Sequence, residues 1–309
     1  MKIFGPVPSR RLGMSLGVNN IPYKICTYSC VYCQIGKAVK MQAEREIFYP
    51  PEELLAEVET ALGKTGGGVD YLTVVPDGEP TLDLNLGRLI GRLKETGIPV
   101  AVITNASLLH LPDVRKELAL ADWVSVKIDT VKKETWKRID RPYKSLDLER
   151  TLDAVGHFAG AFHGKLATET MLVRGINDTP EECVAAADFI QTVKPTISFL
   201  AIPTRPPAVS TALPPDEAVL NAAYQIFSER LDSVEYLTGY EGNAFSSTGN
   251  ATEDILSITA VHPMREDAVR ELLRKNGDNW KVVENLLHEG SLQESSYNNH
   301  YYYLRKFTR

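Results

Sequence analysis

Cysteine is scarce in this 309-residue chain, which has only four, three of them within eight residues. A disulfide-stapled small domain is therefore excluded, and 43% hydrophobic residues predict a core that needs no disulfides. No apolar run approaches the length of about 18 residues that a membrane-spanning helix needs, and the first residues do not resemble a secretory signal. We therefore expect a cytoplasmic protein with no membrane contact, in which clustered cysteines indicate a metal site.

Acidic residues are absent from the first 43 positions, although the whole chain has a net charge of −6. This segment contains six cationic residues: Lys2, Arg10, Arg11, Lys24, Lys37 and Lys40. A locally cationic segment suits an anionic cluster, a carboxylate or a phosphate, and it is equally compatible with a solvated basic face. The net negative charge argues against nucleic-acid binding through a basic footprint of the whole molecule.

The middle of the chain alternates short apolar runs with amphipathic segments. We expect strands near 16–21, 69–76, 98–104, 122–128, 166–173 and 196–203, separated by helices over 51–62, 84–96, 108–120, 146–162, 180–193 and 215–230. This alternation predicts an α/β fold with a parallel sheet. Six units fit a partial or complete barrel or an open doubly wound sheet. Polar residues follow nearly every predicted strand, so we expect the site at the carboxyl ends of the strands.

The α/β pattern stops after residue 232, and the domain organisation predicted from this is a 1–232 core, a 233–250 linker rich in Gly, Asn and Ser, and a 251–309 C-terminal domain. The last segment predicts three short helices near 253–259, 265–275 and 279–288, followed by a hairpin around Asn298 and Asn299. This is the order of a small winged-helix-like α+β domain. Nine acidic residues against eight Lys or Arg argue against strong phosphate binding, so protein contact or a structural cap is at least as good an interpretation.

Cys26, Cys30 and Cys33 have the spacing C-x3-C-x2-C. Three thiolates on one short loop can each bind one iron of a cubane and leave the fourth iron open to a ligand. A structural zinc site needs a fourth protein ligand. The sequence offers only histidines without metal spacing and Cys183, which we expect to be a buried thiol on an amphipathic helix. The spacing therefore favours a [4Fe–4S] cluster over zinc.

The run from Cys26 to Cys33, with the aromatic Tyr32 before the last cysteine, resembles the signature of the radical S-adenosylmethionine (SAM) superfamily. The resemblance implies a partial (β/α)6 barrel and a cluster whose open iron binds SAM. It also implies reductive cleavage of SAM to methionine and a 5′-deoxyadenosyl radical, with electrons from an external donor such as flavodoxin or ferredoxin. The substrate is left open between RNA, a peptide or protein, and a small molecule.

The opening from Phe4 to Val18 resembles the wyosine-tRNA-synthase-like Fe–S oxidoreductases within that superfamily. Wyosine synthases carry a second cluster on additional cysteines, and this chain has only Cys183 beyond the triad. The resemblance therefore predicts the subgroup but supports neither a second cluster nor the wyosine reaction itself.

Several further site residues follow from the resemblance. Asp77-Gly78-Glu79-Pro80 resembles the glycine–glutamate motif that contacts the SAM amino group, and glycine lets the backbone approach closely. The other positions implied to contact SAM or the substrate are Thr104, Asn105, Lys127, Asp129 and Glu169, with Arg10 and Arg11 as candidates to neutralise a carboxylate or phosphate.

A second hypothesis makes the chain a regulator, in which an Fe–S cluster senses redox state and the winged-helix tail reads a partner. Only the tail motivates this hypothesis. A sensor needs neither an open iron nor a carboxylate placed to hold SAM. We therefore favour the enzyme, and a SAM titration of the reduced cluster separates the two.

Overall fold

The main body of the chain is one curled sheet of eight strands. The computed structural model describes residues 2–65, 68–238, 245, 247, 249–260 and 263–306. The strand order is β1-β2-β5-β6-β7-β8-β9-β10, and every neighbouring pair is parallel except β1 with β2. The strands are β1 (Ile3–Ser9), β2 (Gly13–Val18), β5 (Tyr71–Val74), β6 (Val100–Thr104), β7 (Trp123–Lys127), β8 (Lys165–Met171), β9 (Ile197–Ala201) and β10 (Val234–Leu237). Two short strands, β3 (Ile25–Cys26) and β4 (Lys40–Met41), pair separately.

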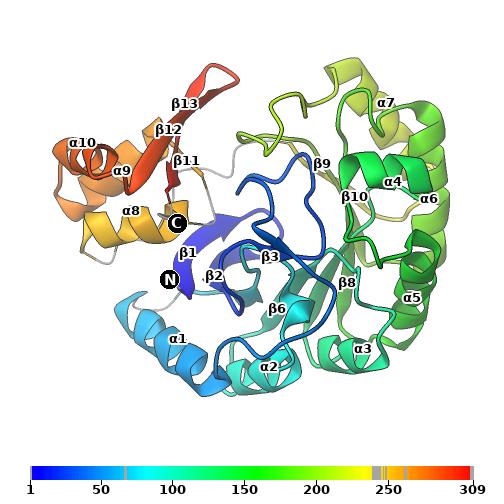
Figure 1. Cartoon of the computed structure of the whole chain (residues 1–309), viewed down its shortest axis with the longest axis horizontal. Coiled ribbons are helices and arrows are strands. Elements are labelled where there is room, and N and C mark those ends of the chain that lie inside the picture. Colours follow the sequence, from blue (N-terminus) through cyan, green and yellow to red (C-terminus); the bar gives the residue numbers. More distant parts are fainter. Residues whose placement is uncertain are drawn as a thin grey trace.

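Helices cover the outer side of the curl (Figure 1). Proline begins α1, α3 and α6, at a position where its missing N–H costs no hydrogen bond. Asp147 and Thr179 cap α5 and α6 by accepting a backbone N–H. No helix within the described ranges is both long and apolar enough to cross a membrane. These helices are α1 (Pro51–Thr65), the short 3-10 helix η1 (Pro80–Leu82), α2 (Leu86–Lys94), α3 (Pro112–Leu118), α4 (Lys133–Ile139), α5 (Leu148–Ala161), α6 (Pro180–Val193) and α7 (Glu217–Ser228).

Side chains of the parallel strands alternate between this helix-covered face and the inner face of the curl. In β7, Val124 and Val126 are fully buried in the main core, whereas Lys127 lines a cavity. In β8, Leu166 belongs to the same core and Glu169 lines the cavity. The inner face near the carboxyl ends of the strands therefore carries the charged residues.

All six strands predicted from the sequence are present, as β2 and β5 to β9, and the α/β partial-barrel prediction is confirmed. Two further strands of the eight-stranded sheet, β1 and β10, were not predicted. β1 contains Pro6 and Pro8, which a strand tolerates at the edge of a sheet, where β1 lies. Residues 234–237, which the sequence analysis placed in the expected linker, form β10 and pair in parallel with β9. The sequence does not indicate β10 because the strand is short and a Gly- and Ser-rich segment follows it.

The C-terminal segment contains the predicted three helices and hairpin. They are α8 (Ala251–Thr259), α9 (Glu266–Asn276), α10 (Lys281–His288), β12 (Leu292–Tyr297) and β13 (His300–Arg305), with an additional strand β11 (Met264–Arg265) that pairs with β13. Asn298 and Asn299 have φ of 46° and 60°, as a two-residue hairpin loop requires. The winged-helix assignment and the three-part domain division stay predictions, and residues 239–244, 246 and 248 of the expected linker lie outside the described residues.

The C-terminal segment packs against the start of the chain. Helix α8 contacts β1, and Val7 of β1 is buried in the same hydrophobic cluster as Phe245 and Ile255. Figure 1 shows these helices beside the β1 end of the sheet. The edge strand β1 is thereby covered, as exposed sheet edges need to be.

Candidate active site

A cavity of about 290 Å³ lies at the carboxyl ends of the parallel strands. It brings together every site residue predicted from the sequence except Asp129: Arg10, Arg11, Cys26, Cys30, Tyr32, Cys33, Gly78, Glu79, Thr104, Asn105, Lys127 and Glu169. A larger groove of about 420 Å³ lies elsewhere, between β1, α1 and α8, and no cysteine lines it. The chemistry-bearing residues therefore share the smaller, more buried space.

The cysteine loop follows β3, and backbone hydrogen bonds connect it to the end of α4. Val31 N donates to the Ile139 carbonyl at 2.9 Å, and Cys33 N donates to the Cys30 carbonyl at 3.2 Å. Lys24 Nζ lies 3.4 Å from Cys33 Sγ. This cation and the backbone turns hold the three thiols toward one space.

Each thiol has its own polar neighbour. Cys26 Sγ lies 3.5 Å from Tyr28 N and 3.8 Å from Asn105 Nδ2, contacts that favour a thiolate. Burial, with a smaller contribution from Glu79, raises the pKa of Cys26 to about 12. A bound metal ion would supply the positive charge that favours a thiolate at this position.

The arrangement fits a cluster better than a single ion. Among the described residues, no three His, Cys, Asp or Glu side chains converge on one metal position. That finding concerns single ions, because in a cubane each thiolate binds a different iron. The fourth thiol, Cys183, is buried on α6 in the main core, as predicted, and does not line the cavity. Cys26, Cys30 and Cys33 are thus the described cysteines that line the cavity, and their number suits three irons of a cubane.

The turn after β5 passes directly beneath the cysteine loop. A Cβ at Gly78 would lie 1.8 Å from the carbonyl oxygen of Ile25, so only glycine fits between the two segments. Glu79 N donates to the same carbonyl at 3.3 Å. The glycine of the motif therefore places the β5 turn against the residue that precedes Cys26.

The Glu79 carboxylate joins the ends of β5 and β6. It accepts hydrogen bonds from Thr81 Oγ1 at 2.6 Å, Thr104 Oγ1 at 2.5 Å and Asn105 N at 2.8 Å, and it is 1% exposed. Asn105 Nδ2 in turn donates to Thr27 Oγ1 at 2.7 Å. Glu79 and Asn105 thus connect the β5 turn to the cysteine loop, and the contacts of Glu79 and Thr104 to SAM stay predictions.

Asp77 has an acceptor that the protein does not use. Its Oδ2 accepts from Asn19 Nδ2 at 3.1 Å, whereas its buried Oδ1 has no hydrogen-bond partner among the described residues. Burial raises the pKa of Asp77 to about 6, although the Lys24 charge opposes this. A buried acceptor left without a donor in a cavity wall marks a place for a ligand's donor.

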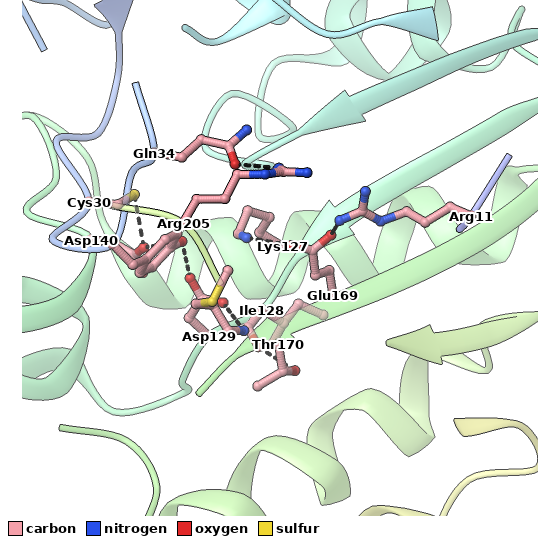
Figure 2. Close-up of polar contacts among 12 residues, drawn as sticks. Arg11, Cys30, Gln34, Lys127, Ile128, Asp129, Asp140, Glu169, Thr170 and Arg205 are labelled. Carbon is pink, nitrogen blue, oxygen red and sulfur yellow. Dashed lines mark hydrogen bonds and ion pairs between the residues drawn. The ribbon is translucent and has the colours of Figure 1, made fainter. Parts of the chain in front are cut away.

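Lys127, Glu169 and Arg11 form a buried ionic cluster on the inner face (Figure 2). Lys127 and Glu169 are register partners on β7 and β8, which places Lys127 Nζ 2.9 Å from Glu169 Oε1, and Arg11 pairs with the other carboxylate oxygen. Burial alone would raise the pKa of Glu169, but Arg11 and Lys127 lower it to about 2. Arg11 Nε is buried without a hydrogen-bond acceptor in the described part of the chain.

Asp129 does not line the cavity. The sequence analysis expected it to contact SAM or the substrate. Asp129 accepts hydrogen bonds from the Tyr32 hydroxyl and from Met171 N, the latter at 2.7 Å. Asp140, which follows α4, lies 3.3 Å from both Cys30 Sγ and the Tyr32 hydroxyl. Burial, with the Asp129 charge, raises the pKa of Asp140. The two carboxyls support Tyr32 and the cysteine loop from behind.

Comparison with known proteins identifies the family. Residues 20–190 match the model of the radical SAM superfamily. A UPF0026 protein of Methanocaldococcus jannaschii is 41% identical over 305 residues, which cover 98% of this chain and 95% of that protein. TYW1 with a lysine–pyruvate adduct has a similar fold, with TM-score 0.56 and 15% identity over 72% of this chain and 76% of that one. Streptococcus suis SuiB bound to SAM gives TM-score 0.54 and 15% identity over 71% and 49%.

The superfamily predicted from the cysteine spacing is confirmed, and so is the fold that it implies. The cofactors of that superfamily are a [4Fe–4S] cluster and SAM. By its matched domain and its UPF0026 relative, this chain belongs to the radical SAM superfamily.

Proposed function

We propose that this chain is an enzyme that binds its [4Fe–4S] cluster through Cys26, Cys30 and Cys33 and cleaves SAM to modify a substrate. One observation carries the proposal: the three thiols, the Gly78 turn and the unused acceptor of Asp77 face one cavity. A redox sensor would need the thiols but not an acceptor for a ligand beside them.

When bound, the cluster supplies the electron that splits SAM into methionine and a 5′-deoxyadenosyl radical. The chain's own residues bind and orient. Gly78 brings the β5 turn against the cysteine loop, and Glu79 fixes that turn to the end of β6. Asp77 Oδ1 accepts an N–H or O–H of SAM, which is a cation at its sulfonium centre. Lys24 offsets the negative charge of the Cys33 thiolate.

The inner face beyond these residues receives the substrate. Lys127, Glu169 and Arg11 hold one another in fixed positions there, so they offer a preorganised polar wall. An external donor such as flavodoxin or ferredoxin supplies electrons. The substrate is an RNA, a peptide or a small molecule. A peptide has a precedent in the fold, because one SuiB structure is described as bound to its precursor peptide SuiA.

The test is 5′-deoxyadenosine formation by protein reconstituted with iron and sulfide without oxygen, then given dithionite and SAM. We expect cleavage in the wild type, its loss in Cys26→Ala, Cys30→Ala and Cys33→Ala, and its retention in the control Cys183→Ala. The triad variants should also bind substoichiometric iron. Cleavage that survives a triad substitution would refute the assignment of the cluster ligands. A well-formed wild-type cluster whose spectrum does not change when SAM is added would refute the enzyme hypothesis and favour the sensor hypothesis.

A further inference from the structure

We propose that an acidic electron-carrier protein docks on the face formed by α4 and the segment after it, and reduces the cluster from there. This α4 face comprises Arg138, Arg141 and Lys144 and a depression beside them. The step moves one electron from the carrier, which is oxidised, to the cluster, which is reduced, and transfers no atom or proton. The use of that electron to cleave SAM rests on the proposed function.

Cations are concentrated in residues 132–144. This run contains six Lys or Arg and two acidic residues, in a chain whose net charge is −6. The cations are Lys132, Lys133, Lys137, Arg138, Arg141 and Lys144, and all six are exposed. Of the two acids, Glu134 is exposed, whereas Asp140 is buried beside Cys30 Sγ. The α4 face therefore presents positive charge to solvent.

Half of these cations lie in ion pairs, which are Lys132 with Glu182, Lys133 with Asp147 and Lys137 with Glu134. The other three, Arg138, Arg141 and Lys144, have no carboxylate partner in the part of the chain that the structure describes. Arg138 donates to the Gly175 carbonyl at 3.1 Å, a contact that leaves its charge unbalanced. An acidic partner would balance these charges and would be steered toward them.

The same segment forms the outer wall of the cysteine loop. Tyr143 N donates to the Thr27 carbonyl at 2.8 Å, and Ser29 N donates to the Asp140 carbonyl at 3.0 Å. Residues 27–31 thus run alongside residues 139–143. A protein docked on the α4 face would therefore rest on the segment that contacts the cluster ligands.

The depression, of about 280 Å³, brings this face next to a cysteine. It is lined by Val31, Ile176, Val209, Ala212 and Thr211, together with Arg138 and Arg141. Val31 directly follows Cys30, which lines the cavity, so the α4 face and the cavity are one residue apart along the cysteine loop. Protein interfaces combine apolar side chains with polar ones and are enriched in Arg, as this depression is.

A nucleic acid suits this face less well. Among the described residues, no aromatic side chain lines the depression, so bases would have no platform on which to stack. No described residue lines both the depression and the cavity. A nucleic-acid substrate bound here would therefore lie away from the cavity in which SAM is cleaved, whereas an electron carrier needs only to approach the cluster.

Reduction of the cluster by a protein donor tests the α4 face. The reconstituted protein is mixed without oxygen with a reduced, acidic flavodoxin, and the EPR signal of the reduced cluster is followed in samples frozen at successive times. We expect Arg141→Glu with Lys144→Glu to slow this reduction about tenfold or more at low salt, because attraction becomes repulsion. Reduction of the same variant by dithionite, which needs no docking face, should be unchanged.

A second variant and a control accompany this test. Arg138→Glu with Lys144→Glu should slow the reduction in the same way, and it leaves Arg141, whose φ is 48°, in place. Arg88→Glu with Arg92→Glu is the matched control, since it makes the same change of net charge on α2, well away from α4 (Figure 1). The control should be reduced at close to the wild-type rate. Added salt should slow the wild type and bring it nearer to the α4-face variants.

Three results would overturn the proposal. The first is a wild-type cluster that dithionite reduces but neither the flavodoxin nor an acidic ferredoxin does. The second is reduction of both α4-face variants as fast as the α2 control. The third is binding of transfer RNA to the wild type that the α4-face variants lose while flavodoxin still reduces them at the wild-type rate, which would assign the face to a nucleic acid.

The same preparations separate this proposal from the proposed function. Cleavage of SAM with dithionite, together with α4-face variants that flavodoxin reduces as fast as the control, refutes the docking face alone. Reduction through the α4 face in a protein that cleaves no SAM refutes the enzyme and leaves the docking face standing.

Discussion

Replacing Asp77 by Asn should stabilise the protein and impair SAM binding at the same time. Asp77 is 3% exposed, and one of its oxygens has no hydrogen-bond donor among the described residues. Its charge is therefore costly in the absence of ligand. Asparagine has nearly the same shape and can still accept from Asn19, but it carries no charge for a cationic ligand.

The magnitude follows from the pKa of Asp77, which burial raises from 3.8 to about 6. Between these values the folded state binds a proton that the unfolded state does not, so wild-type stability falls as pH rises through this window. The full loss is about 3 kcal/mol, taking about 1.4 kcal/mol per pKa unit. Asp77→Asn lacks this titration. Its stability should exceed that of the wild type by up to that amount at pH 7 and by nothing below pH about 4.

Asp83→Asn is the matched control. Burial also raises the pKa of Asp83 to about 6, and Asp83 is fully buried, but it does not line the cavity. Both variants should therefore lack the wild type's loss of stability over this pH window. Only Asp77→Asn should lose SAM affinity.

The measurements are thermal denaturation of the cluster-free protein from pH 4 to 8 and SAM binding by the cluster-loaded protein at pH 7. A gain of about 3 kcal/mol corresponds to a rise in melting temperature of several degrees. The reasoning fails if Asp77→Asn is as stable as the wild type at pH 7, or if its SAM affinity equals that of Asp83→Asn.

Three other substitutions test the site. Gly78→Ala should prevent cluster loading, measured as bound iron, because its Cβ would meet the Ile25 carbonyl, whereas Gly91→Ala, in open space on α2, should load fully. Glu79→Ala leaves several buried donors unsatisfied and should lower the free energy of unfolding in urea by about 2–4 kcal/mol. This variant should keep the cluster but bind SAM more weakly, and an unchanged SAM affinity would show that Glu79 is not part of the SAM site. Arg11 and Lys127 lower the pKa of Glu169 to about 2, although burial alone would raise it. The free energy of unfolding of the wild type should therefore fall by about 3 kcal/mol as the pH falls from about 4.5 to 2, and that of Glu169→Gln should not. The same pH dependence of stability in both proteins would contradict this.

The sequence predicts the parallel strands well because each is a short apolar run buried on the helix-covered face, as Val124 and Val126 show in β7. It does not predict β1, whose prolines argue against a strand until its edge position is known. Nor does it predict β10, which has four residues and is specified by pairing with β9 more than by its own pattern. Tertiary context decides both cases.

The same division holds in the site. The cysteines are visible through their spacing, and Lys127 and Glu169 are visible because charged residues interrupt strand patterns. Asp140 could not be predicted, because its contact with Cys30 joins residues 110 positions apart. Gln34 gives no signal either, since its partner Arg205 lies 171 positions away. Local patterns show which residues carry chemistry, and the fold shows which residues support them.

The buried ionisable groups of the cavity divide into those that the protein balances and those that it leaves for a ligand. Glu169 is balanced by two cations, and the Glu79 carboxylate by hydrogen bonds from its neighbours. The acceptor of Asp77 and the Nε donor of Arg11 are buried and have no such partner among the described residues. Groups of this kind persist where a ligand completes them. An unused acceptor beside Gly78 suits a ligand's donor, and an unused donor before β2 suits a ligand's acceptor, so the two groups favour opposite partners.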